Sequence, residues 1–163
     1  MTGVLFVCLG NICRSPAAEG IFTRLATEAG LLGARPRLRI DSAGTGDWHV
    51  GRPPDPRMIA AIGRRGVDIS HLRARQVMPR DVGDFDFVLA MDNANLNDLR
   101  ALAAADHRAK PQLFLSLADA LAEQEQEVPD PYYGGPEGFD HCLDLIETGA
   151  AALLHKVREA ARL

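Results

Sequence analysis

The feature that most constrains the fold is a short run of apolar residues close to the N-terminus. Val4 to Val7 are four consecutive apolar residues, which is typical of a strand buried on both faces of a sheet. From Ala17 onward, apolar residues recur at helical spacing as far as Gly30, a residue type that often ends a helix. A strand that leads through a short loop into a helix is the start of a β-α-β unit. We therefore expect a parallel sheet covered by helices.

The rest of the chain continues this alternation. Further strands are predicted at residues 37–41, 85–91 and 111–115, with helical patterns between them and a last helix at residues 139–162. The chain has 163 residues, which suits a single domain over residues 1–163. The predicted class is α/β, with three layers and helices on both faces of the sheet. Ligands of such folds bind at the carboxyl ends of the strands, and Cys8 follows the first strand directly.

The loop after the first strand carries the residues for phosphate chemistry. Cys8 and Arg14 are separated by five residues, and Ser15 and Pro16 then begin a helix. Backbone N–H groups at the start of a helix stabilise a thiolate and bind phosphate oxygens. The Arg14 guanidinium can hold two of those oxygens. We predict that Cys8 is a nucleophile, although a buried cysteine at a strand end is the plainer alternative.

Two other residues of the loop fit this interpretation. Gly10 and Asn11 suit a tight turn, because both residue types tolerate positive φ better than most. Ser15 is placed to donate its hydroxyl proton to the sulfur of Cys8 and to help the thiolate leave later.

Residues 7–16, Val-Cys-Leu-Gly-Asn-Ile-Cys-Arg-Ser-Pro, resemble the phosphate loop of low-molecular-weight protein tyrosine phosphatases. Segments 41–51, 90–96 and 130–134 match that family in order and spacing, so the resemblance covers essentially the whole chain. It implies a four-stranded sheet of order 2-1-3-4 with the phosphate-binding loop after strand 1. It also implies hydrolysis of phosphotyrosine in proteins, and of small aryl phosphates, through a phosphocysteine intermediate on Cys8. The phosphoryl group would be held by Arg14 and by the loop residues Leu9, Gly10, Asn11, Ile12 and Cys13.

Such a reaction also needs an acid to protonate the leaving oxygen and a base to activate water, and one carboxyl group can do both. Asp130 lies in a loop with prolines on both sides and glycines after it. On spacing alone an Asp-Pro pair is equally well a turn former. The family resemblance implies that Asp130 is the general acid and then the base.

Aromatic residues of two loops are candidate substrate contacts. Trp48, the only tryptophan, lies in a polar, glycine-rich stretch rather than in an apolar run. The resemblance implies that Trp48 and Tyr132 form the walls of a deep slot for a phenyl ring. Leu9 could line the same slot. Tyr133 could be a wall residue, a core residue or a site of phosphorylation, and the sequence does not choose.

The resemblance also implies support for the phosphate loop. Asn11 would hold the loop in shape through hydrogen bonds to Ser42 and to a histidine near residues 74–76. This chain departs from the family there: Leu72 stands where the family usually has histidine, and His71 lies one residue earlier. His71 is therefore a candidate loop support, with a surface or helix-cap histidine as the alternative.

The other two cysteines differ in their expected roles. The resemblance implies that Cys13 can trap oxidised Cys8 as a reversible disulfide, so it is a candidate redox partner as well as a loop residue. Cys142 lies at a helical core position and is expected to be inert. Three cysteines make no disulfide framework.

Charge and hydropathy limit the classes of molecule that the protein is expected to bind. The formal net charge is −4, which argues against a protein that binds nucleic acid through its phosphates. No apolar run approaches a membrane span, and the first strand leaves no room for a signal peptide. We expect a cytoplasmic protein, a monomer or weak dimer, that acts on phosphotyrosine-containing proteins without a cofactor or metal.

Other functions remain as alternatives. A protein-arginine phosphatase of the same fold would carry threonine in place of Ile12 and tends to have phenylalanine in the acid loop. A thiol-based arsenate reductase needs two more cysteines after residue 70, and none lies between Cys13 and Cys142. A non-catalytic phosphate-binding module would most simply lack Cys8, Arg14 or Asp130. A nucleotide-binding P-loop would need a Gly-Lys-Ser/Thr sequence, which is absent.

Overall fold

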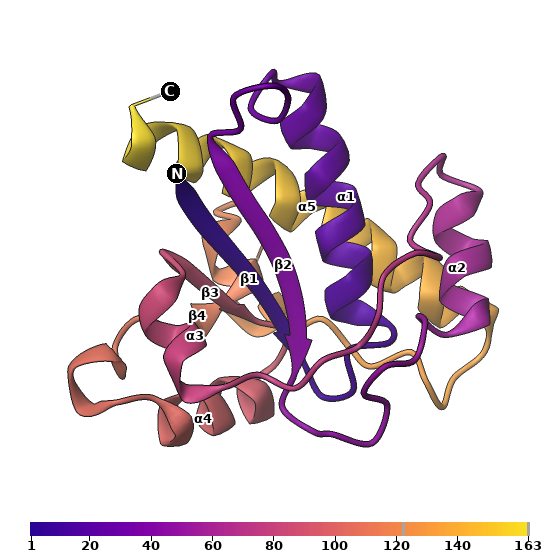
Figure 1. Ribbon diagram of the computed structural model, residues 1–163. Coiled ribbons are helices and arrows are strands. Elements are labelled where there is room, and N and C mark those ends of the chain that lie inside the picture. Colours follow the sequence, from indigo (N-terminus) through magenta and orange to yellow (C-terminus); the bar gives the residue numbers. More distant parts are fainter. Residues whose placement is uncertain (122, 163) are drawn as a thin grey trace.

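A four-stranded sheet lies at the centre of the computed structural model, which describes residues 1–121 and 123–162 (Figure 1). All strands run parallel, in the order β2-β1-β3-β4. The strands are β1 (Thr2–Cys8), β2 (Leu38–Gly44), β3 (Phe87–Ala90) and β4 (Gln112–Leu113). Their order confirms the predicted 2-1-3-4 arrangement.

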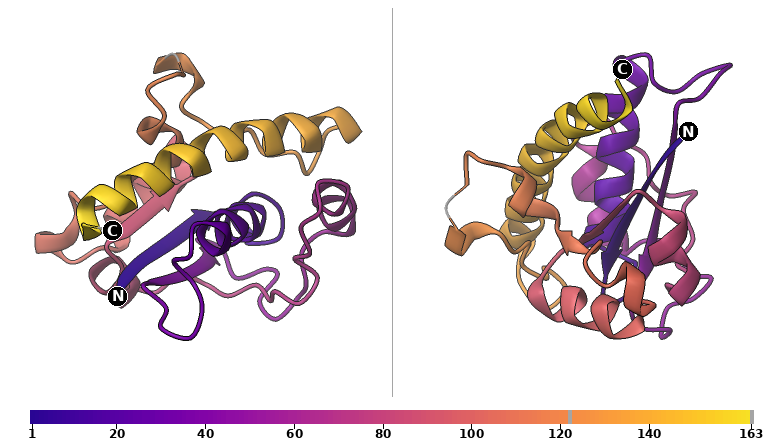
Figure 2. Two further views of the ribbon diagram at one scale, coloured as in Figure 1. Left: turned by 90° about the horizontal axis from the view of Figure 1, so that it is seen from above. Right: turned by 90° about the vertical axis from the view of Figure 1, so that its left-hand side faces the viewer.

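Helices cover both faces of this sheet (Figure 2). They are α1 (Arg14–Glu28), α2 (Pro56–Gly63), α3 (Pro79–Asp84), α4 (Asn93–Leu102) and α5 (Pro136–Ala161). α1 and α5 lie against each other on one face, and α2 packs against α5. α3 and α4 cover the other face. The predicted three-layer α/β class is confirmed.

The side chains of β1 alternate between the two layers of core. Val4 and Phe6 join the larger cluster under α1 and α5, whereas Leu5 and Val7 join the cluster under α3 and α4. The ring of Phe6 meets those of Phe22 and Phe114 edge to face, with centroids 5.9 and 5.3 Å apart. Burial on both faces explains why residues 4–7 are apolar without interruption.

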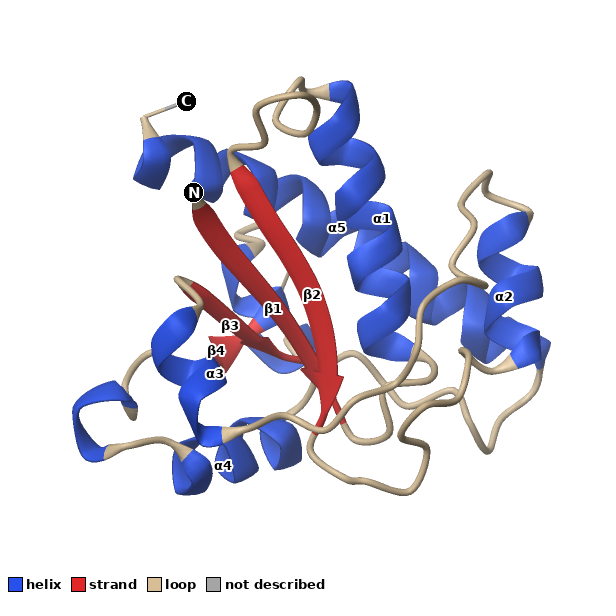
Figure 3. Ribbon diagram, in the orientation of Figure 1, coloured by secondary structure: helices blue, strands red, loops and turns tan. Residues whose placement is uncertain are grey.

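The bounds of several elements differ from the predicted ones, and α3 lies where no helix was predicted (Figure 3). β2 continues past residue 41 to Gly44, because residues 41–44 pair in register with Leu5 to Cys8. β4 is only two residues long, because the chain turns at Phe114 into a 3₁₀ helix. α3 has six residues, too few to show a helical period in the sequence, and its start is fixed by the Asp81 carboxylate, which accepts from the Met78 N–H at 2.7 Å.

Backbone hydrogen bonds gather the loops at the carboxyl ends of the strands. Thr45 N–H donates to the carbonyl of Cys8, and Asp55 N–H donates to the carbonyl of Ile12. Val128 N–H donates to the carbonyl of Met91, just after β3. The loops that follow β1, β2 and β4 are therefore held around one edge of the sheet, where ligands of parallel α/β folds bind.

Truncating the central aromatic residue should destabilise the protein strongly. Phe6→Ala removes a fully buried ring from between two others, and we expect a loss of about 3–5 kcal/mol in the free energy of unfolding. Phe87→Ala, at a half-buried position of β3, is the control and should cost clearly less. Denaturant unfolding measures both, and equal losses would contradict the assigned core.

Candidate active site

Cys8 and Arg14 lie at the two ends of a five-residue loop, because Cys8 ends β1 and Arg14 begins α1. The loop runs so close to β2 that a Cβ on Gly44 would lie 2.8 Å from the Leu9 carbonyl oxygen and 3.2 Å from the Asn11 nitrogen. Only glycine permits that approach without a shift of the backbone. The strand pair β1–β2 thus fixes the base of the loop.

Asn11 gives the loop its shape. Its φ is +55°, in the left-handed region that non-glycine residues seldom adopt. Its backbone N–H points at the Cys8 sulfur, with N···Sγ at 3.3 Å. Its buried side-chain amide donates to Ser15 Oγ at 2.8 Å and to Ser42 Oγ at 2.9 Å, and accepts from the backbone N–H of Arg75 at 3.0 Å. All the hydrogen-bonding groups of this amide are therefore satisfied at fixed positions.

The Cys8 sulfur is paired with a hydroxyl. Ser15 Oγ lies 2.9 Å from Cys8 Sγ, and both side chains are buried. Ser15 Oγ accepts from Asn11, so its own proton can go to the sulfur or to the Ala43 carbonyl, which lies farther away at 3.5 Å. The predicted neighbourhood of Cys8 and Ser15 is thus present in the structure.

Arg14 is buried among acceptors. Its Nη1 donates to Asp92 Oδ2 at 2.6 Å and to the Val128 carbonyl at 3.0 Å, and its Nη2 lies 3.6 Å from Asp130 Oδ2. Burial alone would lower the pKa of Arg14, but Cys8, Asp92 and Asp130 raise it above its ordinary value. The guanidinium therefore stays charged at the edge of the loop.

A cavity of about 460 Å³ opens above this loop. It brings together nine predicted site residues, namely Cys8, Leu9, Gly10, Ile12, Cys13, Arg14, Trp48, Asp130 and Tyr132. His49 and Tyr133 line it as well. Trp48 is 68% exposed and Tyr132 36% exposed, so these aromatic side chains form the rim rather than the floor. Asp130 also lies at the rim, where its Oδ1 accepts from the Tyr132 N–H at 3.1 Å.

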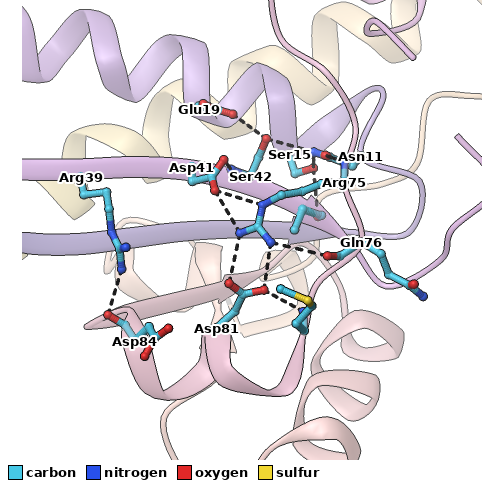
Figure 4. A network of polar contacts seen from close by, with 12 residues as sticks. Asn11, Ser15, Glu19, Arg39, Asp41, Ser42, Arg75, Gln76, Asp81 and Asp84 are labelled. Atoms are coloured by element: carbon cyan, nitrogen blue, oxygen red, sulfur yellow. Dashed lines mark hydrogen bonds and ion pairs between the residues drawn. The ribbon is translucent and has the colours of Figure 1, made fainter. Parts of the chain in front are cut away.

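The supports of Asn11 differ in part from those expected (Figure 4). Ser42 is a partner, as the resemblance implies, but the Ser42 hydroxyl donates to the carboxylate of Glu19 at 2.5 Å. Among the residues that the structure describes, His71 is not a hydrogen-bond partner of Asn11 or Ser42. Its exposed side chain instead lines a second cavity together with Glu19. The one-residue offset of the histidine leaves Leu72, not an imidazole, in the apolar packing.

Glu19 is a site residue that sequence reasoning missed. It lies one helical turn after Ser15 in α1, so the two side chains share a face of the helix. Burial raises the pKa of the Glu19 carboxyl to about 7, against the opposite effect of the Ser42 hydrogen bond; Asp41 raises it further and Arg75 lowers it. The four-residue spacing from Ser15 was the one signal available in the sequence.

Arg75 is a second missed residue. Its guanidinium pairs with Asp41 of β2 at 3.0 Å and with Asp81 of α3 at 2.9 Å. This bridge fixes the backbone N–H that Asn11 accepts from. Nothing in the sequence shows that carboxylates 34 residues before and six residues after Arg75 meet at it.

Asp92 has two roles in the structure. Its Oδ1 accepts from the Asn95 N–H at 2.8 Å and so caps α4, while its Oδ2 holds Arg14. The capping role follows from its position before a helix. The pairing with Arg14 depends on the sheet order, which places β3 beside β1.

The remaining cysteines are buried thiols. Burial and the nearby Asp55 raise the pKa of Cys13 far above its ordinary range, and burial raises that of Cys142 to about 12. Both are therefore neutral at physiological pH. The role of Cys13 as a redox partner of Cys8 stays a prediction.

The described part of the chain holds neither a metal-binding cluster nor a membrane-spanning helix. Within residues 1–121 and 123–162, no three His, Cys, Asp or Glu side chains are grouped so that they could hold a metal ion. Within the same residues, no helix has the length and apolar character needed to cross a membrane.

Comparison with known proteins agrees with the geometry. Residues 3–163 match the family model described as low molecular weight phosphotyrosine protein phosphatase. The low molecular weight protein-tyrosine-phosphatase YfkJ of Bacillus subtilis is 41% identical over 164 residues, which cover 100% of both chains.

Solved structures are similar over almost their whole length. A protein tyrosine phosphatase from Entamoeba histolytica aligns with a TM-score of 0.90 and 35% identity, over 98% of this chain and 99% of that one. A Drosophila arginine phosphatase aligns with a TM-score of 0.85 and 31% identity, over 97% and 98%.

The raised pKa of Glu19 predicts a pH-dependent stability. The unfolded carboxyl titrates near pH 4.5 and the folded one near pH 7, so between these values the native state holds a proton that the unfolded chain releases. The stability from this group is fully present below pH 4.5 and is lost as the pH rises to 7, by about 3 kcal/mol. The free energy of unfolding of Glu19→Gln should not fall in this way between pH 4.5 and 7. That of the control Glu28→Gln, a change at an exposed position, should fall as in the unmodified protein. Identical pH profiles for Glu19→Gln and the unmodified protein would contradict the raised pKa.

Proposed function

We propose that this protein hydrolyses phosphotyrosine in proteins through a phosphocysteine intermediate. The premise is that the chain belongs to the low molecular weight phosphotyrosine protein phosphatase family. The observation that carries the proposal is the meeting of Cys8, Arg14 and Asp130 at one cavity. A nucleophile, an anion-binding cation and a proton donor are the groups that hydrolysis of a phosphate monoester requires.

In the first step the Cys8 thiolate attacks phosphorus in line with the leaving oxygen. The phosphoryl oxygens are held by Arg14 and by the backbone N–H groups of residues 9–14. These donors are already in place before the reaction, so charge that develops in the transition state meets fixed dipoles. The Ser15 hydroxyl, 2.9 Å from the sulfur, stabilises the thiolate when it leaves in the second step.

Asp130 serves as the acid of the first step and the base of the second. Its carboxyl group lies at the rim of the cavity, on the side from which the phenolic oxygen departs. Donation of its proton to that oxygen leaves a carboxylate, which then removes a proton from the water that attacks the phosphocysteine. The free phosphate and the thiolate are regenerated together.

The proposed preference for phosphotyrosine depends on the side chains at the rim of the cavity. The exposed rings of Trp48 and Tyr132 offer aromatic faces to a phenyl ring, and the shorter side chain of phosphoserine would not reach Cys8 past them. The similar Drosophila protein is described as an arginine phosphatase, so the fold alone does not choose the substrate. Ile12 and the Tyr132-Tyr133 pair favour phosphotyrosine over phosphoarginine.

The setting that fits this chemistry is the reducing cytoplasm. Cys8, Cys13 and Cys142 are all free thiols, and a catalytic thiolate needs protection from oxidation. Reversible capture of oxidised Cys8 by Cys13 would supply such protection.

Comparison of three phosphopeptides tests the substrate class. Peptides of one sequence with phosphotyrosine, phosphoserine or phosphoarginine should differ in kcat/KM by at least about 100-fold in favour of phosphotyrosine, because only its ring fills the slot. Cys8→Ser should abolish turnover of all three and still bind inorganic phosphate. Preference for phosphoarginine, or turnover by Cys8→Ser, would refute the proposal.

Replacement of the acid should depend on the leaving group. Asp130→Asn cannot donate a proton, so it should slow the first step with the poor leaving group tyrosine by about 10²–10⁴-fold. An aryl phosphate with an acidic phenol should lose much less. Pre-steady-state release of the phenol measures this step, and equal losses for both substrates would remove Asp130 from the acid role.

A further inference from the structure

We propose that Glu19 is a positioning residue for the phosphate-binding loop, acting through the Ser42 hydroxyl on the side-chain amide of Asn11. The contacts that carry the proposal run from Glu19 through Ser42 and Asn11 to Ser15 (Figure 4), and Ser15 Oγ lies 2.9 Å from the Cys8 sulfur. Only the catalytic readout of its test rests on the proposed function.

The Arg75 N–H determines the direction of the hydrogen bonds that Asn11 makes to the two serines. Asn11 Oδ1 accepts from the Arg75 N–H, so its Nδ2 must face the other way and donates both of its hydrogens. One goes to Ser15 Oγ and the other to Ser42 Oγ. Each serine oxygen therefore accepts from Asn11, and its own proton must find an acceptor elsewhere.

The two protons leave in opposite directions. The Ser15 proton has two acceptors in reach, the Cys8 sulfur at 2.9 Å and the Ala43 carbonyl at 3.5 Å, whereas the Ser42 proton goes to Glu19 Oε2 at 2.5 Å. A carboxylate accepts such a proton more strongly than a neutral carboxyl group does. Without an acceptor at Glu19, the Ser42 proton would be unsatisfied or would turn towards Asn11, where it would face an N–H.

The hydrogen bond between Ser42 and Asn11 matters because Asn11 needs its neighbours to keep its backbone conformation. Its left-handed backbone costs free energy and persists only because surrounding contacts hold it. The same backbone directs its N–H at the Cys8 sulfur. A weaker bond from Asn11 to Ser42 would thus loosen a donor of the phosphate cradle although Glu19 itself touches neither the sulfur nor the substrate.

Glu19 can change its charge in place. It lines a cavity of about 300 Å³ between α1 and residues 68–72. The charged and titratable groups around it are Asp41 from β2, Asp68 and His71 from the cavity wall, and Arg75 from beyond Ser42. The pKa of Glu19, raised to about 7, places both of its forms near neutral pH. The ionised form accepts the Ser42 proton more strongly, so it holds Asn11 more firmly.

The test compares Glu19→Gln with the unmodified protein. Glutamine keeps the shape and an acceptor oxygen, but it cannot ionise. Glu28→Gln is the matched control, because it removes the same charge from an exposed position of the same helix. His71→Asn separates the titration of Glu19 from that of the histidine on the cavity wall.

Two readouts are needed. The first is the side-chain ¹⁵N amide resonance of Asn11, followed by NMR from pH 5 to 9. The second is the ratio of the variant's kcat to that of the unmodified protein at each pH, which cancels the ionisations that both proteins share.

We expect the Asn11 resonance to titrate near pH 7 in the unmodified protein, in Glu28→Gln and in His71→Asn, and to stay flat in Glu19→Gln. The kcat ratio for Glu19→Gln should be close to one at pH 5.5 and fall about three- to tenfold by pH 8, the rate equivalent of a charged against a neutral hydrogen bond.

Persistence of the Asn11 titration in Glu19→Gln, its loss in His71→Asn, or a kcat ratio that does not change with pH would overturn the proposal. Loss of all catalysis in the unmodified protein would refute the proposed function instead, and the NMR titration would still decide the role of Glu19.

Discussion

The side-chain amide of Asn11 is the contact on which the rest of the site depends. It joins the phosphate-binding loop to α1 through Ser15, to β2 through Ser42 and to the backbone at Arg75. A buried amide whose groups are all bonded has one orientation, and a change in any partner would leave a buried polar group unsatisfied. The amide therefore holds the loop in the conformation that directs the Asn11 N–H at the Cys8 sulfur. Such preorganisation is what electrostatic stabilisation of a transition state requires.

A second constraint is the burial of charge. Arg14 is only 3% exposed, and a buried guanidinium is tolerated only when it is paired and hydrogen-bonded. Asp92 meets that need at 2.6 Å and at the same time caps α4, so the cation of the loop and the helix after β3 are held by one carboxylate. Asp130 is farther away, at 3.6 Å, and more exposed. The tight pair with Asp92 fixes Arg14 in place, and Asp130 is held more loosely at the rim of the cavity.

The sequence predicts the parts of this molecule that local rules determine. Residues 4–7 indicated a buried strand, the residues from Cys8 to Pro16 indicated a loop between strand and helix, and nine of the predicted residues line one cavity. The features that the sequence analysis missed or misplaced depend on contacts between segments that are far apart in the sequence. β2 extends to Gly44 through its pairing with β1, and the Arg75 bridge depends on two carboxylates from separate elements. His71 was chosen by its nearness in sequence to a family position, but one residue of offset turns a side chain out of the network and into solvent.

The buried part and the rim of the site have different physical roles. Asn11, Ser15 and Ser42 are almost fully buried and bound to each other, so a change in one is felt by all of them. Trp48 and Tyr133 are 68% and 92% exposed, and a change there alters what the cavity admits without disturbing the loop. The Entamoeba histolytica tyrosine phosphatase and the Drosophila arginine phosphatase share this fold, with TM-scores of 0.90 and 0.85. A rigid interior and a variable rim are consistent with one fold serving both classes of phosphatase. Phosphotyrosine and phosphoarginine carry the same phosphoryl group, which the interior would bind, but they differ in the side chain that the rim would contact.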